Sequence, residues 1–126
     1  MSAWGADDVD RIGRADEVEI ATRRADGSLR PDRVVWVVRL GDELYLRSVN
    51  GRDAAWFRGT RTRMEGRIRA DGVERDVAFV DADDVYGDAL DGVYRSKYRR
   101  FSGALDRITA ADARAATLTI VPAAPR

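Results

Sequence analysis

The alternation of hydrophobic and polar residues predicts β-strands along most of the chain. In residues 17–24, Val18, Ile20 and Thr22 share one face, which is the period-two pattern of a half-buried strand. Residues 33–40 differ, because they are apolar on both faces and rich in β-branched side chains, as in a central strand covered on both sides. The predicted strands are 17–24, 33–40, 43–49, 62–70, 73–80 and 116–123.

Helical spacing of apolar residues predicts the helices between these strands. Val9 and Ile12, preceded by two aspartates, predict a short amphipathic helix near the N-terminus. Residues 52–60 are long enough for a helix of about two turns. Residues 83–101 carry a broad apolar stripe with acidic residues first and basic residues last, which suits the dipole of a longer helix. Residues 107–115 are expected to form a loop with a helical turn.

Tight turns at 25–28, 41–42 and 71–72 join the strands into an antiparallel arrangement. Because neighbouring strands are joined by hairpins rather than by helical crossovers, the order predicts a mainly β (α+β) fold. We expect a six-stranded antiparallel barrel with short flanking helices and one longer helix near the C-terminus. The chain has 126 residues, so we expect a single domain over residues 1–126.

The composition restricts the chemistry available to the protein. The chain has no cysteine and no histidine. Their absence excludes disulfides, thiolate catalysis, Cys-type zinc sites and the Ser-His-Asp triad, and we predict no metal site. Any reaction is therefore expected to take its chemistry from a bound cofactor.

The charge pattern restricts the partners. Lys and Arg together number 22, as do Asp and Glu, so the net charge is zero and gives no drive toward nucleic acid or an anionic membrane. The segment YRSKYRRF (94–101) interleaves basic and aromatic residues, but its helical spacing favours packing on the barrel over nucleic-acid binding. The acidic N-terminus lacks the apolar run of a signal peptide, and no segment reaches membrane-spanning length, so we expect a cytoplasmic protein.

The segment LRSVNGRDAAWFR (46–58) is a candidate anion-binding cradle, since a strand ends there in an Asn-Gly turn and a helix follows. A glycine permits close backbone approach, amides at a helix start attract anions, and arginines bind phosphate oxygens in a bidentate manner. The same residues would also form an ordinary turn with solvated arginines. The candidate residues are Arg33, Arg47, Ser48, Asn50, Gly51 and Arg52.

Two segments carry a resemblance to a known superfamily. RVVWVVRLGDELYLRSVNGRDAAWFR (33–58) and ALDGVYRSKYRRF (89–101) resemble the FMN-binding split barrels of the pyridoxamine-phosphate-oxidase-like superfamily, and within it a small bacterial family of unknown function. The resemblance implies a split barrel and a homodimer that holds FMN or a deazaflavin coenzyme between its subunits. The chain departs from the oxidases at VVRL (37–40), where they usually carry a lysine.

The resemblance also assigns expected positions to the ligand. It places Arg33 at the entry of the second strand, Arg47 and Ser48 at the end of the third, and the Asn50–Arg52 step at the next helix, all toward the cofactor phosphate. Trp36 would pack against the planar ring, although aromatic residues in central strands more often belong to a core or a dimer contact. A separate hypothesis, from the segment 94–101, is that Tyr94, Arg95 or Tyr98 reaches the substrate side of a cofactor pocket.

Two functions from different classes follow. The first is an FMN- or deazaflavin-dependent oxidoreductase that transfers hydride to or from a small organic substrate. The alternative is a non-catalytic split-barrel dimer that binds a small ligand or a partner protein, because a fold alone does not determine a function.

Overall fold

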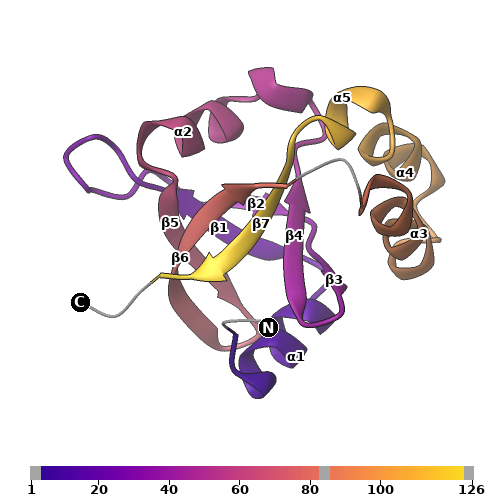
Figure 1. The fold of residues 1–126 in the computed structure, drawn as a ribbon, viewed down its shortest axis with the longest axis horizontal. Helices are drawn as coiled ribbons and strands as arrows, with labels where there is room; N and C mark the ends of the chain where they lie inside the picture. The colour runs from indigo at the N-terminus through magenta and orange to yellow at the C-terminus, as the bar shows by residue number, and fades with distance from the viewer. Residues whose placement is uncertain (1–3, 83–85, 124–126) are drawn as a thin grey trace.

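The computed structural model describes residues 4–82 and 86–123, and within them seven antiparallel strands form one strongly curled sheet (Figure 1). The strands are β1 (Val18–Thr22), β2 (Arg33–Val35), β3 (Val38–Leu40), β4 (Glu43–Arg47), β5 (Glu65–Ala70), β6 (Val73–Asp81) and β7 (Thr117–Pro122). Their order across the sheet is β2-β1-β5-β6-β7-β4-β3. The mainly β fold with antiparallel pairing is therefore confirmed.

The prediction of six strands is wrong, because the expected strand 33–40 is broken at Trp36 and Val37. Its first half pairs with β1 and its second half with β4, so that β2 and β3 lie at the two opposite edges of the sheet although they are nearly consecutive in the chain. The short segment between Val35 and Val38 spans these edges. This connection requires the sheet to curl into the form of a split barrel.

Both faces of the broken strand are nevertheless covered, as its apolar pattern indicated. Val35 and Val37 pack in the cluster inside the curled sheet, whereas Trp36 and Val38 pack in a second cluster on its outer face. The helices that cover this outer face belong to the C-terminal part of the chain (Figure 1).

The helices are α1 (Ala6–Arg14), α2 (Ala55–Arg63), α3 (Gly87–Lys97), α4 (Ser102–Ile108) and α5 (Ala111–Arg114), with a 3-10 turn at Gly51–Asp53. In Figure 1, α3, α4 and α5 lie together on one side of the sheet, beside β4, while α1 and α2 lie at opposite ends of it. The predicted helices near Val9 and over 52–60 are confirmed with shifts of a few residues at their ends.

The longer C-terminal helix is shorter than predicted. Residues 83–85 of the predicted segment lie outside the described residues, and α3 ends at Lys97 instead of residue 101. The chain then turns and forms α4, which the sequence pattern did not predict. The turn brings Leu105 and Ile108 onto the same outer cluster as Tyr94, so that tertiary packing, rather than local spacing, accounts for α4.

The predicted hairpins at 41–42 and 71–72 are confirmed. Asp71 and Gly72 both have positive φ angles, 49° and 78°, which match the right-handed twist of the two strands they join. No helix of residues 4–82 and 86–123 has both the length and the apolar character needed to span a membrane.

Candidate functional site

A cavity of about 440 Å³ lies between the broken strand, the segment after β4, and α4. Its lining residues are Glu17, Arg33, Val34, Val35, Trp36, Arg47, Val49, Asn50, Trp56, Ala104, Arg107 and Ile108. Two other hollows have volumes of about 550 and 600 Å³, and the first of them shares Glu17 and Val34 with this cavity. Among the described residues, no aromatic side chain lines either hollow. The volume of the 440 Å³ cavity is within the range of about 300–1,000 Å³ that is usual for small-molecule sites.

Two exposed arginines face this cavity from opposite parts of the sequence. Arg33 begins β2, and no hydrogen bond or ion pair joins its guanidinium to another described residue. Arg107 comes from α4, and its Nη2 donates to Oδ1 of Asn50 at 2.8 Å. Several N–H groups of each guanidinium are therefore available to an anionic ligand.

Two tryptophans supply flat apolar surface to the same cavity. The ring of Trp36 lies parallel to the ring of Tyr98, with centroids 3.8 Å apart and planes inclined by 1°. Trp56, from α2, is half-buried and also lines the cavity. A cavity with aromatic walls and cations nearby suits a planar ligand that carries a phosphate or a carboxylate.

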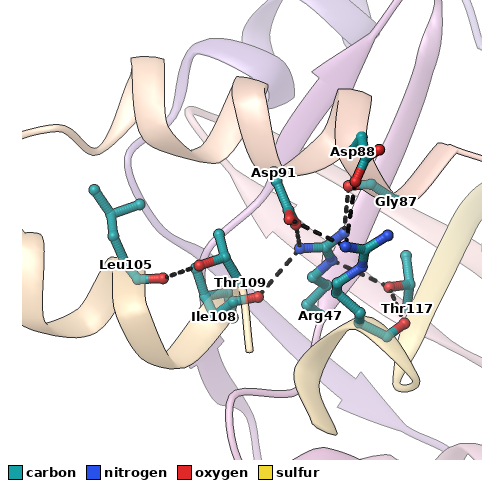
Figure 2. A network of polar contacts seen from close by, with 9 residues as sticks. Arg47, Gly87, Asp88, Asp91, Leu105, Ile108, Thr109 and Thr117 are labelled. Atoms are coloured by element: carbon teal, nitrogen blue, oxygen red, sulfur yellow. Dashed lines mark hydrogen bonds and ion pairs between the residues drawn. The ribbon is translucent and has the colours of Figure 1, made fainter. Parts of the chain in front are cut away.

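Arg47 has a different environment from the one that the sequence suggested (Figure 2). Its side chain is fully buried; it forms an ion pair with Asp91 of α3 and donates to the carbonyl oxygens of Gly87 and Ile108, both at 3.2 Å. Its Nε donates to Oγ1 of Thr117 at 3.1 Å. Arg47 thus contributes to the wall of the cavity. Its guanidinium connects β4 to α3, α4 and β7.

The remaining residues of the predicted cradle do not converge on the cavity. Ser48 is completely buried, and its hydroxyl has no hydrogen-bond partner among the described residues. Gly51 has a φ of 76° and packs against Asp112 of α5. Arg52 donates to the carbonyl of Ala115 at 3.0 Å and lies over the ring of Phe57, away from the cavity. Of the six predicted anion-binding residues, the structure places Arg33 and Asn50 at the cavity with exposed side chains.

The two tyrosines predicted for the substrate side are buried in the outer cluster. The hydroxyl of Tyr94 has no hydrogen-bond partner among the described residues, and burial raises its pKa. The hydroxyl of Tyr98 donates to the carbonyl of Asp16 at 2.6 Å, and burial raises its pKa as well. In this arrangement Tyr98 reaches the cavity only indirectly, through its stacking on Trp36.

Sequence reasoning missed Arg107, Glu17 and Trp56 as residues of this cavity. Arg107 lies in a segment expected to be a loop, so that no local pattern marked it; only the folding of α4 brings it to Asn50. Glu17 directly precedes β1, where its alternation indicated only an exposed side chain.

Comparisons with known proteins support the fold. A solved F420-H2-dependent reductase superposes with a TM-score of 0.61 at 12% identity, covering 84% of this chain and 93% of its own. The heme storage protein HutZ from Vibrio cholerae gives a TM-score of 0.64 at 11% identity over 99% of this chain and 93% of its own. A third structure, described as a domain-swapped dimer, gives 0.61 at 13% identity over 84% of this chain and 79% of its own. At such identities these similarities show the fold alone.

Comparison with curated protein sequences finds no match to this chain. A family profile, in contrast, matches residues 8–120, which is nearly the whole chain. The protein therefore belongs to the family described as uncharacterized protein conserved in bacteria, DUF2255.

Proposed function

We propose that this protein binds a flavin-type cofactor, FMN or a deazaflavin coenzyme, in the 440 Å³ cavity, and that it acts as an oxidoreductase on a small organic substrate. The observation that carries the proposal is the unpaired guanidinium of Arg33 in a cavity that also presents Arg107 and two indole rings. The similarity to F420-H2-dependent reductases supports it at the level of the fold.

The residues of the cavity fit the two parts of such a cofactor. Arg33 and Arg107 would bind its phosphate or another anionic group, with Asn50 holding the guanidinium of Arg107 in place. Trp36 and Trp56 would pack against the ring system and exclude water from it. The cofactor would supply the hydride transfer, and the chain would supply binding, orientation and a dry environment.

Arg47 has a structural part in this proposal. Its guanidinium is bound to Asp91 of α3 and to the carbonyl of Ile108 of α4, so Arg47 positions these two helices. Through α4 it also positions Arg107, which faces the ligand. The anion site is therefore proposed at Arg33, Asn50 and Arg107 in place of the 47–52 cradle alone.

We further propose that the functional unit is a homodimer. The edge strand β2 has one neighbour, β1, and its central residue Val34 is 59% exposed. Phe101, which contacts Trp36, is 42% exposed. An exposed apolar patch beside an open sheet edge is typical of an interface. The domain-swapped dimer among the similar structures supports this assembly. A cytoplasmic location and the absence of nucleic-acid binding remain predictions.

The visible absorption and fluorescence of the purified protein, measured before and after addition of FMN or the deazaflavin, test the cofactor. We expect Arg33→Ala and Arg107→Ala each to weaken FMN binding by roughly 10–100-fold, the value of one charge-assisted hydrogen bond, and to affect riboflavin much less. Arg95→Ala is the matched control, because Arg95 is exposed on α3 and does not line the cavity.

Equal losses for FMN and riboflavin would place the phosphate elsewhere. A protein that binds neither cofactor would contradict the proposal as a whole. Binding without any transfer of hydride to or from the reduced or oxidised cofactor would favour the alternative, a non-catalytic dimer that holds a small ligand.

A further inference from the structure

The break in the strand at Trp36 and Val37 leaves backbone groups that no neighbouring strand satisfies. Val37 is completely buried, so its N–H and carbonyl need partners within the protein. They find them at the end of α3: the N–H of Val37 donates to the hydroxyl of Tyr98 at 3.3 Å, and its carbonyl accepts from Nζ of Lys97 at 2.7 Å. Two side chains thus take the place of a sheet neighbour.

The same two side chains hold the segment that leads into β1. Nζ of Lys97 also donates to the carbonyls of Gly13 and Ala15, at 2.9 and 2.7 Å, and the hydroxyl of Tyr98 donates to the carbonyl of Asp16 at 2.6 Å. Lys97 therefore binds three carbonyl oxygens with the three N–H groups of its ammonium, and Tyr98 bridges two chain segments.

These segments lead directly to two walls of the candidate site. In the β1–β2 ladder Val18 pairs with Val35, and continuing this register by one position places Glu17 opposite Trp36. Both residues line the 440 Å³ cavity. The next position would place Asp16 opposite Val37, and the hydroxyl of Tyr98 joins their backbones where a ladder bond would otherwise lie.

We propose that Lys97 and Tyr98 are positioning residues for this cavity: by holding the backbone at 13–16 and at Val37, they place Glu17 and Trp36 as its walls, and the charge of Lys97 controls this placement. A neutral amine has two N–H groups for three carbonyls, so loss of the proton leaves one of the three carbonyls without this donor. The expected effect of Lys97 deprotonation on ligand binding rests on the function proposed above, whereas its expected effect on the position of Trp36 does not.

The charges around Lys97 allow this control near neutral pH. Burial lowers the pKa of Lys97 to about 8, and the nearby carboxylate of Asp16 opposes that shift. Asp16 itself pairs with Arg100 at 3.2 Å, and Arg39 of β3, which packs on Gly13, is paired with Asp10 and Asp42. The ring of Tyr98 lies 5.1 Å from Nζ, and the carboxylate of Glu17 acts on the hydroxyl of Tyr98.

The wild-type protein allows a direct test, because Lys97 is the only lysine in the chain. Lysine labelled with ¹³C at Cε gives one NMR signal, whose shift reports the protonation of Lys97 between pH 6 and 10. The stack of Trp36 on Tyr98 is followed in parallel by near-UV circular dichroism, taken as the difference from Trp36→Phe. We expect both signals to change with the same midpoint.

Lys97→Met, which keeps the aliphatic stem and removes the ammonium, should show the high-pH dichroism at every pH. Arg95→Met, the exposed neighbour on α3, should behave as the wild type. A Trp36 signal that stays constant while Lys97 titrates would overturn the proposal, and so would a wild-type titration in Lys97→Met. If Lys97→Met does not fold, the wild-type titration decides.

FMN titrations at pH 7 and 9 separate this proposal from the proposed function. We expect binding to the wild type to weaken by roughly tenfold at the higher pH, the equivalent of one lost hydrogen bond, and binding to Lys97→Met to be weak at both. If FMN binds at neither pH while Trp36 still follows Lys97, the cofactor assignment fails and the positioning role holds.

Discussion

Replacement of Arg47 by methionine should lower the free energy of unfolding by about 3–5 kcal/mol, because it breaks a buried ion pair and leaves the other charge behind. The side chain of Arg47 is 0% exposed and that of its partner Asp91 is 9% exposed. The carboxylate keeps a longer contact with Arg114, at 3.5 Å, which compensates in part. The carbonyls of Gly87 and Ile108 lose a donor as well, so the estimate stays in the upper range for a single substitution.

Two further variants separate the ion pair from the packing of the arginine stem. Arg47→Met combined with Asp91→Leu removes both charges, and we expect this double variant to be clearly more stable than Arg47→Met alone, since apolar replacement of a whole buried pair is often nearly neutral. Arg11→Met is the surface control. Its pair with Asp7 spans 3.4 Å between side chains that are 45% and 79% exposed, and its loss should cost less than about 1 kcal/mol.

Urea unfolding followed by far-UV circular dichroism gives the free energies, with equal m-values required for the comparison. FMN and riboflavin titrations of the same proteins complete the test. A loss of less than about 1 kcal/mol in Arg47→Met would refute the structural role. If, in addition, FMN binding weakened while riboflavin binding did not, Arg47 would be a direct phosphate ligand, as the sequence pattern first indicated.

Three other predictions follow from particular contacts. Gly66→Ala should destabilise the protein by about 1–3 kcal/mol or more, because the added Cβ would lie 2.2 Å from the carbonyl oxygen of Ala21 in the neighbouring strand. Gly92→Ala, in open space on α3, should stabilise it by about 0.5–1 kcal/mol. Urea unfolding measures both free energies. Tyr94→Phe should cost little because its buried hydroxyl has no partner among the described residues, whereas Tyr98→Phe should cost about 1–3 kcal/mol, and equal costs would contradict the hydrogen-bond assignment. Burial lowers the pKa of Lys97 from 10.5 to about 8, so the unfolded state binds more protons than the folded state between these two pH values. The free energy of unfolding should therefore rise with pH from about 8 to 10.5, compared with that of Lys97→Met. The same pH dependence in both proteins would contradict this prediction.

Much of the fold could be predicted because its signals are local. The alternation of apolar and polar residues in β1, β5 and β6 indicates which side chains face the interior. Turn residues such as Asp71 and Gly72 indicate where the backbone has a positive φ. Each of these signals is contained in a few consecutive residues. The antiparallel pairing and the strand positions, apart from the break in 33–40, are accordingly confirmed.

The candidate site could be predicted only in part, because its residues are distant in sequence. Asn50 was identified from the turn within 46–58, and Arg33 from the resemblance to the split barrels. Arg107, in contrast, comes from a helix whose formation depends on packing against Tyr94 and Tyr98. Arg47 shows the reverse case. An arginine at the end of a strand has the same local pattern whether it faces a ligand or a buried aspartate, and only the approach of α3 decides between the two.

The sequence by itself thus determined the strands, the hairpins and the absence of cysteine and histidine chemistry, since these depend on residue type and short-range order. The tertiary structure decided where the central strand breaks, which arginines remain free for a ligand, and how Lys97 and Tyr98 hold the break. The physical reason is that buried polar groups must find partners. Those partners, such as Asp91 for Arg47 or Lys97 for Val37, come from segments that only the folded chain brings together.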